Sequence, residues 1–194
     1  MEGIPLRPTH YRVDGFLIRA YREGDGEPLY KSVQASREHL RPFIPWARQD
    51  IDFETTVRTV GEIIGRWERG EDYTVGIWDG EELIGGTGFH LRVGGPETGN
   101  AEIGMWINVD HAGRGLGTKV LAAMLDWGFT EWGWQRLVWK CDVRNEGSIR
   151  VAQKNGLVLE GTFRSDHIAN DGSRADTHVF AILRSEWEAR RLPK

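Results

Sequence analysis

The chain has 194 residues, of which 39% are hydrophobic and 28% charged, and its formal net charge is −4 at pH 7. This length fits a single domain spanning residues 1–194 better than two domains. The composition is that of a soluble protein able to bury a core. The negative charge argues against direct nucleic-acid binding, and no apolar run approaches the roughly 18 residues that suggest a membrane span.

A single cysteine, Cys141, excludes an internal disulfide framework and fits a reducing compartment. Its neighbours in RLVWKCDV indicate a buried strand, so we interpret Cys141 as a core residue rather than a nucleophile. The N-terminal MEGIPLRPTH lacks an apolar signal region, and we therefore expect a cytoplasmic protein. The six histidines show no metal-ligand spacing, so we expect no metal site.

The first part of the chain predicts a strand, two helices and a β-meander. Helical periodicity and capping residues mark the helices, and the proline-containing RPFIPW separates them. Alternating apolar residues mark the strands, and Asp79-Gly80 is a strong hairpin signal. In chain order the expected elements are a strand at 16–21, helices at 25–40 and from Asp52 to Gly70, and strands at 73–79, 82–93 and 101–109.

The second part predicts an alternation of helices and strands. The expected elements are a helix at about 117–132, a strand at 136–143, a helix at 148–155, strands in LVLEGTFR and THVFAILR, and a terminal helix in SEWEARR. The strand–helix–strand unit over 101–143 requires a parallel pair with a right-handed crossover. We therefore predict an α/β protein with a mixed, mostly antiparallel sheet that contains one parallel pair and is flanked by helices.

Residues 111–120, HAGRGLGTKV, place three glycines between a predicted strand and a predicted helix. Such a turn exposes backbone N–H groups, and the helix N-terminus adds partial positive charge, so the two together can bind a phosphate. Arg114 and Lys119 strengthen this interpretation in an acidic chain. A tight turn that needs glycine only for positive φ is the alternative. The glycines are Gly113, Gly115 and Gly117.

Two common nucleotide patterns fail at this stretch. The Walker loop requires G-x-x-x-x-G-K-S/T, but Thr118 stands between Gly117 and Lys119. The Rossmann fingerprint would need a glycine at position 118, and it normally follows the first strand of its domain. A nucleotide-phosphate module is therefore the weakest interpretation.

The stretch resembles motif A of the GNAT superfamily of N-acetyltransferases, Gln/Arg-x-x-Gly-x-Gly/Ala, with Ala112 as a departure at the first position. Farther on, DVRNEGSIRVAQKNGLVLEG is similar to the N-x-x-S…K-x-G-F-x-x-E-G signature of the RimJ/RimL-type branch, whose named substrates are ribosomal proteins. HLRPFIPWA (39–47), AEIGMWI and LRSEW resemble further segments of this branch in the same order. The resemblance covers nearly the whole chain.

The resemblance implies the GNAT fold, with a splayed parallel strand pair, and acetyl transfer from acetyl-CoA to a primary amine in a ternary complex. Backbone groups around Ile107 and Val109 are expected to pair with the pantetheine arm, and N–H groups nearby to meet the oxyanion. Arg144, Arg150 and Lys154 are candidates for the adenosine phosphates, with a solvated helix face as the alternative. The implied cofactor contacts are Ile107, Val109, Gly113, Arg114, Gly115, Leu116, Gly117, Thr118, Asn145 and Ser148.

Two side chains are candidates for proton transfer. Glu102, on the strand that leads into the glycine turn, is the candidate base, either directly or through water. Its alternative is an ordinary ion-paired strand carboxylate, and Asp142 or Asp176 could substitute as the base. Ser148 is the candidate acid, because related enzymes place this serine near the CoA sulfur, and a helix N-cap is the alternative.

Trp46 and Trp106 are candidate walls of the acceptor pocket, with plain core packing as the alternative. We expect the acceptor to be a protein N-terminal α-amine, whose free-base fraction at neutral pH exceeds that of lysine by roughly two orders of magnitude. A polyamine or aminoglycoside acceptor and a non-catalytic acyl-CoA sensor stay open as alternatives. We also consider a homodimer, because strand edges are expected to be exposed.

Overall fold

The computed structural model describes residues 7–191, so that most of the N-terminal segment considered above lies outside the described part. The strands are β1 (His10–Val13), β2 (Phe16–Ala20), β3 (Tyr73–Asp79), β4 (Glu82–Gly95), β5 (Asn100–Ile107), β6 (Arg136–Asp142), β7 (Val158–Ile168) and β8 (Arg174–Leu183). The helices are α1 (Gly26–Leu40), α2 (Phe53–Glu68), α3 (Leu116–Trp127), α4 (Glu146–Lys154) and α5 (Arg184–Arg191), with short turns η1 (Pro45–Arg48), η2 (Val109–His111) and η3 (Gly128–Trp132).

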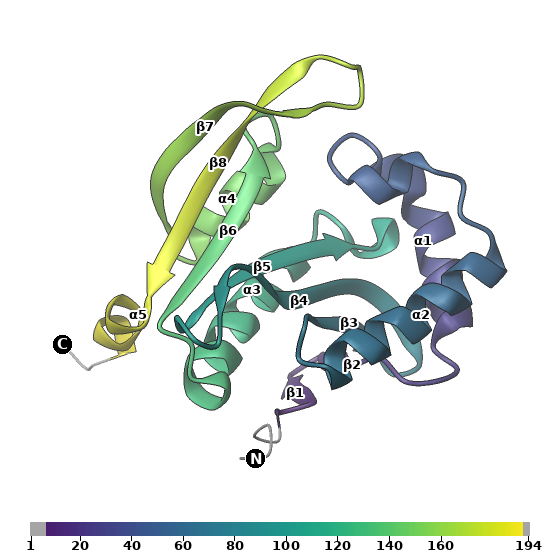
Figure 1. Cartoon of the computed structure of the whole chain (residues 1–194), viewed down its shortest axis with the longest axis horizontal. Helices are drawn as coiled ribbons and strands as arrows, with labels where there is room; N and C mark the ends of the chain where they lie inside the picture. Colours follow the sequence, from purple (N-terminus) through teal and green to yellow (C-terminus); the bar gives the residue numbers. More distant parts are fainter. Residues whose placement is uncertain (1–6, 192–194) are drawn as a thin grey trace.

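The eight strands form one sheet in the order β1-β2-β3-β4-β5-β6-β8-β7 (Figure 1). Neighbouring strands are antiparallel except for β5 and β6, which are parallel and connected through α3. This topology confirms the predicted mixed sheet with one parallel pair.

The parallel pair is short, and it is the feature that opens the sheet. Residues 100–102 of β5 pair with residues 136–138 of β6. Beyond Glu102, β5 continues to pair with β4 but no longer with β6, and the two strands diverge (Figure 1). We call the point of separation the vertex. Past it, the β6-facing edge of β5 has no strand partner within residues 7–191, which leaves backbone hydrogen-bonding groups for a ligand.

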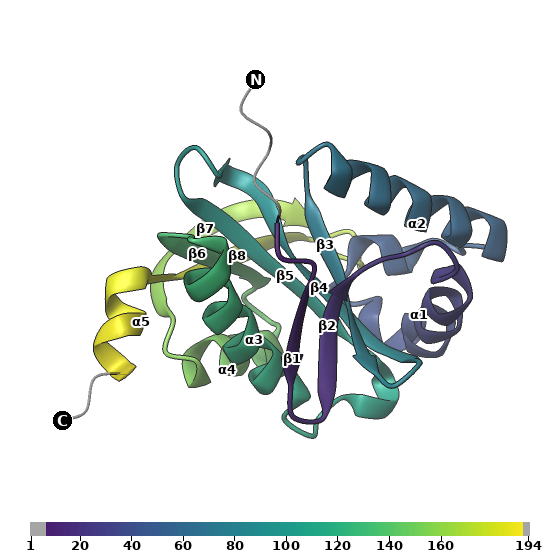
Figure 2. The same ribbon diagram turned by 90° about the horizontal axis from the view of Figure 1, so that it is seen from below.

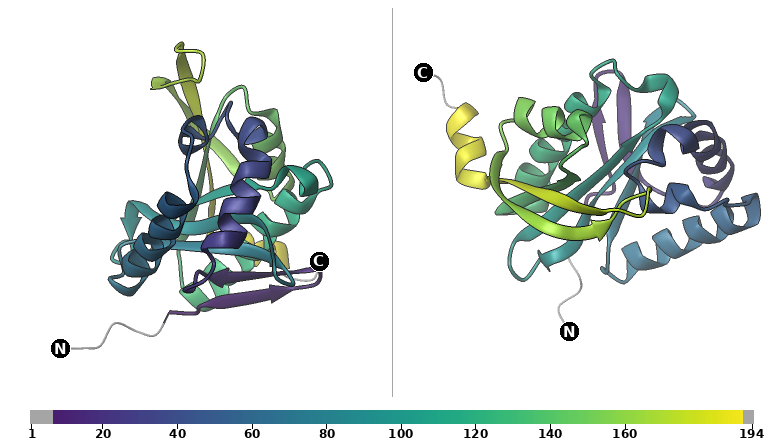
Figure 3. Two further views of the ribbon diagram at one scale, coloured as in Figure 1. Left: turned by 90° about the vertical axis from the view of Figure 1, so that its right-hand side faces the viewer. Right: turned by 90° about the horizontal axis from the view of Figure 1, so that it is seen from above.

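Helices cover both faces of the sheet (Figures 2 and 3). On one face, α3 and α4 pack over the strands, and their core contains Ile103, Leu121 and Met124, which are almost completely buried. On the other face, α1 and α2 enclose a smaller cluster that contains Val60 and Trp78. No helix within residues 7–191 is long and apolar enough to cross a bilayer.

Three local features differ from the predicted elements. The sequence analysis misses β1, a four-residue strand that reverses at Gly15 (φ 90°) and pairs with β2. The helix predicted over 117–132 ends as α3 at Trp127 and continues as the π-helical turn η3. Helix α4 begins at Glu146, because the side chain of Asn145 caps it.

The outer edge of the sheet is formed by β7, whose residues are almost all exposed. The edge of β7 that faces away from β8 has no strand partner in the described part of the chain. The homodimer stays a prediction.

An aromatic cluster occupies the centre of the core on the α3 face. The ring of Phe89 lies 5.1 Å from Trp132, 5.8 Å from Trp127 and 6.0 Å from Trp134, measured between ring centroids. Tyr73 lies 4.6 Å from Trp132 in an edge-to-face arrangement. Such pairs stabilise the fold beyond the burial of their surface alone. Trp127, Trp132 and Trp134 are therefore core residues.

We expect Phe89→Ala to lower the free energy of unfolding by about 3–5 kcal/mol, because deletion of this fully buried ring leaves a cavity among tryptophans. Urea denaturation followed by tryptophan fluorescence measures the change. Phe163→Ala is the matched control: its ring is 52% exposed on β7, and the loss should be about 0.5 kcal/mol or less. Equal losses in the two variants would contradict this account of the core.

Candidate active site

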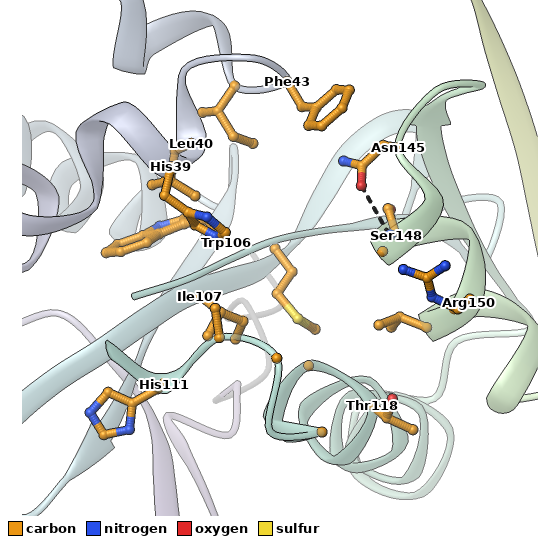
Figure 4. Close-up of a pocket in the computed structure, with 18 of the residues that line it drawn as sticks. His39, Leu40, Phe43, Trp106, Ile107, His111, Thr118, Asn145, Ser148 and Arg150 are labelled. Carbon is orange, nitrogen blue, oxygen red and sulfur yellow. Dashed lines mark hydrogen bonds between the residues drawn. The ribbon is translucent and has the colours of Figure 1, made fainter. Parts of the chain in front are cut away.

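A cavity of about 540 Å³ opens where β5 and β6 part (Figure 4). One mouth is formed by the glycine turn, the start of α3 and one side of α4. The other is formed by the end of α1 and the segment that follows it, including Leu40 and Phe43. Met105, Trp106 and Ile107 of β5 lie between the two. The cavity has the size of a small-molecule site, and it passes through the opening in the sheet.

The glycines of the turn serve two different purposes. Gly113 and Gly115 have positive φ angles of 73° and 84°, and a Cβ on either would meet no heavy atom within 4 Å. Glycine is therefore needed at both positions for its backbone conformation, which agrees with the alternative of a tight turn that requires positive φ. Gly117 lies inside α3, and a Cβ there would lie 3.5 Å from Val151 of α4 and 3.8 Å from Ile107. Its missing side chain leaves room in the cavity.

The N-terminus of α3 faces the same cavity. Gly115 is its N-cap, and no side chain in the described part of the chain caps its first turn. The first N–H groups of a helix need an acceptor, and the partial positive charge at this end favours an anion. Arg150 and Lys154 of α4 also line the cavity, and Arg150 pairs with Glu146 at 2.9 Å. The arrangement can hold a phosphate.

Most of the predicted cofactor contacts meet at this cavity. Those that line it are Ile107, Gly113, Gly115, Gly117, Thr118, Asn145 and Ser148. Arg114, Leu116 and Val109 do not line it. Both backbone groups of Val109 are occupied, in contrast to the expectation: its N–H donates to Ser36 Oγ at 3.0 Å and its C=O accepts from Ala112 at 3.2 Å.

Ser148 is not the N-cap of α4, which was the alternative to its predicted role as the acid. Asn145 Oδ1 caps α4 by accepting from the backbone N–H of Ser148 at 3.0 Å (Figure 4). The Ser148 hydroxyl oxygen accepts from Trp139 Nε1 at 2.9 Å. Because the indole can only donate, the hydroxyl proton of Ser148 is not used toward Trp139, and it is directed at the neighbouring Cys141 thiol. Sequence reasoning missed Trp139, whose signal was its inward position in the alternating RLVWKC strand.

Cys141 of β6 lies next to Ser148 and is a buried core residue. Burial raises the pKa of its thiol, and a hydrogen bond from Ser148 offsets only part of that rise. A thiol with a raised pKa stays protonated at neutral pH and is a poor nucleophile.

Glu102 is buried at the vertex and does not line the cavity. Its Oε1 accepts from Arg92 of β4 at 2.8 Å, and its Oε2 lies 3.0 Å from Lys140 Nζ of β6. The carboxylate thus ties three strands together where the sheet divides. These surroundings match the ion-paired alternative rather than the predicted role as base.

The carboxylates named as substitutes are also engaged. Hydrogen bonds from Arg144 and His167 lower the pKa of Asp142 to about 2, with burial opposing them. Asp142 is therefore a poor proton acceptor at neutral pH. Asp176 accepts the backbone N–H of Ser165 at 2.8 Å.

Trp46 and Trp106 pack against each other, and of the two only Trp106 lines the cavity. Their ring centroids are 5.8 Å apart and their planes cross at 78°. Trp106 lines the cavity and covers Gly86, where its ring leaves no space for a Cβ. Trp46, on η1, is 36% exposed. The pair stands on the sheet face opposite α3.

Comparisons with known proteins agree with this geometry. The Acetyltransferase (GNAT) domain matches residues 16–158. Ribosomal-protein-serine acetyltransferase of Escherichia coli (strain K12) is 30% identical over 86% of this chain and 91% of that protein. YnaD of Bacillus subtilis (strain 168), an uncharacterized N-acetyltransferase, is 30% identical over 92% of this chain and 99% of that protein.

A solved structure gives the same result. RimL, a ribosomal L7/L12 alpha-N-protein acetyltransferase in complex with coenzyme A, superposes with a TM-score of 0.81 at 25% identity, covering 88% of this chain and 95% of that chain. The fold and the cavity define an acyl-CoA-dependent transferase. The chain belongs to the GNAT acetyltransferases, it is an N-acetyltransferase, and its relatives include ribosomal-protein acetyltransferases of the RimL type.

We expect Gly115→Val to weaken coenzyme A binding at least tenfold, because a β-branched residue disfavours φ of 84° and the turn must rearrange. Isothermal titration calorimetry measures the affinity. The control is Gly133→Val, which places the same side chain at φ of 77° outside the cavity and should leave the affinity unchanged. Unchanged binding in Gly115→Val would refute the anion-binding role of the turn.

Proposed function

We propose that this protein transfers the acetyl group of acetyl-CoA to the α-amino group of a protein N-terminus. The observation that carries the proposal is a cavity that passes through the sheet, with an uncapped helix N-terminus at one mouth and an aromatic pair near the other. Donor and acceptor can therefore reach the vertex from opposite faces. Similarity to a ribosomal-protein-serine acetyltransferase favours a protein terminus over a small amine.

On the donor side, the pyrophosphate would rest on the turn formed by Gly113 and Gly115 and on the first N–H groups of α3. The pantetheine arm would follow the unpaired edge of β5 near Ile107, in the place that a further strand would take. Asn145 and Thr118 line the walls beside it. This path brings the thioester toward Ser148 and the vertex.

The reaction needs a neutral amine, a polarised thioester carbonyl and a protonated leaving group. The amine nitrogen attacks the carbonyl carbon, and backbone N–H groups of β5 past the vertex would stabilise the resulting oxyanion. As the C–S bond breaks, Ser148 would supply a proton to the CoA sulfur while its oxygen stays held by Trp139. Glu102 would keep the three strands of the vertex in register through Arg92 and Lys140.

On the acceptor side, the segment after α1 approaches the β7–β8 arm (Figure 1). Arg48 Nη1 donates to the C=O of Ile168 at 3.3 Å and bridges the two. Trp46 lies on the same short turn as Arg48, η1, and packs against Trp106. An extended peptide end fits a site enclosed from two sides, and a terminal α-amine is more often neutral there than a lysine side chain.

Peptides with a free N-terminus should release thiol from acetyl-CoA, whereas the same peptides blocked at the N-terminus but carrying lysine should not. Thiol release and mass spectrometry of the product measure the outcome. The panel also contains polyamines and aminoglycosides. Release with small amines alone would replace the protein acceptor by a small molecule, and tight coenzyme A binding without release across the panel would favour a sensor.

Ser148→Ala should lower kcat by about 100-fold, within the range typical of general acid catalysis, and change the KM for acetyl-CoA less than twofold. Steady-state kinetics with the best acceptor of the panel separates the two constants. Ser173→Ala, at the exposed β7–β8 turn, is the matched control and should match the wild type. An unaltered kcat in Ser148→Ala would remove this residue as the acid.

A further inference from the structure

Asp72, Thr74 and His90 form a hydrogen-bonded chain on the sheet face that carries Trp106. His90 Nδ1 lies 2.8 Å from Asp72 Oδ1, and Thr74 Oγ1 donates to Asp72 Oδ2 at 2.8 Å. The side chains of His90 and Asp72 are only 13% and 17% exposed. Burial raises the pKa of Asp72, but the hydrogen bonds from His90 and Thr74 and the nearby positive charge together outweigh it, so the pKa lies below the ordinary value.

This chain of contacts fixes which nitrogen of His90 is free. An ionised carboxylate can only accept, so the Nδ1 of His90 carries the proton that it shares with Asp72. In the neutral ring Nε2 then has a lone pair and no proton. Nε2 makes no hydrogen bond with any residue in the range 7–191. His90 Nε2 is not among the fully buried polar atoms without a partner, so it keeps contact with solvent and is open to an incoming group.

Two glycines place this free nitrogen at the vertex. A Cβ on Gly104 of β5 would lie 2.9 Å from His90 Nε2, and a Cβ on Gly88 of β4 would lie 3.3 Å from its Cε1. The imidazole thus occupies a slot that side chains at either position would fill. Gly104 lies two residues after Glu102, the last residue of β5 that pairs with β6, and two residues before Trp106, which lines the cavity; His90 itself, like Glu102, does not line it.

The other carboxylates near the vertex already have partners. Glu102 holds Arg92 and Lys140, and Asp142 is held by Arg144 and His167. Among these groups, His90 Nε2 has neither a hydrogen bond nor a paired cation within residues 7–191, whereas Glu102 is flanked by two cations and its Oε2 makes no hydrogen bond of its own.

We propose that His90 is the base that takes a proton from the acceptor's ammonium group, and that Asp72 is the positioning residue that fixes its tautomer. The proposal rests on acetyl transfer to an amine as proposed above, but on no particular amine. The first ammonium proton passes to Nε2 and from there to solvent. The C–N bond then forms and the C–S bond breaks; nitrogen loses its second proton and the CoA sulfur gains one through Ser148. The products are the amide, the CoA thiol and one proton.

The charged groups around His90 come from four elements. Arg66 of α2 acts on Asp72 through its charge, while Arg92 of β4, Glu102 of β5 and Lys140 of β6 form the neighbouring ion-paired group. Only a ring with a lone pair on Nε2 can accept the proton of the ammonium group. The kcat of the wild type should therefore rise with pH and then level off.

His90→Gln tests the proposal with the full chain and whichever amine the wild type acetylates. We expect kcat to fall about 100-fold or more, its rise with pH to disappear, and the Kd for acetyl-CoA to stay within twofold. His10→Gln, on the exposed strand β1, is the matched control and should show wild-type kinetics. Circular dichroism and thermal melting check the fold, and His90→Asn serves as the second variant if His90→Gln does not fold.

Two further measurements separate a base from a merely structural histidine. In Asp72→Asn the rise of kcat with pH should move to lower pH, because a neutral amide no longer favours the protonated ring. With an acceptor whose amino group is weakly basic, such as an aminooxyacetyl peptide, the defect of His90→Gln should shrink at least tenfold, since little of that amine is protonated.

The proposal is overturned if His90→Gln and His90→Asn keep the wild-type pH profile, or if the defect is equal for both kinds of acceptor. It is also overturned if Glu102→Gln, and not His90→Gln, removes the rise of kcat with pH. A failure of the peptide acceptors alone refutes only the proposed substrate, because the His90 test then proceeds with the small amine that the protein acetylates.

Discussion

The separation of β5 from β6 is the constraint on which the rest of the site depends. The two strands share three paired positions and then diverge, so that the sheet has a gap where a continuous sheet would have hydrogen bonds. Unpaired backbone groups in a protein interior need partners. A cofactor arm that takes the place of the missing strand would satisfy them, and this explains why side chains contribute little to that part of the site.

The vertex is held open by charge and by packing. Glu102 links Arg92 on one side with Lys140 on the other, at the last position where the strands are paired. On one face α3 and α4 pack against the strands that flank the gap, and α1 and α2 cover the other face of β3 and β4. Donor and acceptor would therefore have separate approaches to one point, with Ser148 on the proposed donor side and His90 on the proposed acceptor side.

Most of the residues predicted from local patterns meet at one cavity, whereas the contacts that span strands were not predicted. The glycine turn, Asn145 and Ser148 lie in local patterns of strand, turn and helix, and the structure brings them to one cavity. Glu102 stood out because it is a carboxylate on the right strand, but its ion pairs join residues 92, 102 and 140, which no local pattern connects. His90 and Asp72 went unnoticed for the same reason, since they are 18 positions apart.

What the sequence determined by itself was the order of elements, the one parallel crossover and the glycine turn before α3, because each follows from periodicity, capping and turn residues that are close along the chain. Only the tertiary structure decided which polar side chains are free. Glu102 and Asp142 are neutralised by cations, whereas Nε2 of His90 is left open over Gly104. The availability of a proton acceptor depends on its neighbours across strands, and cross-strand register is set by the packing of the whole sheet.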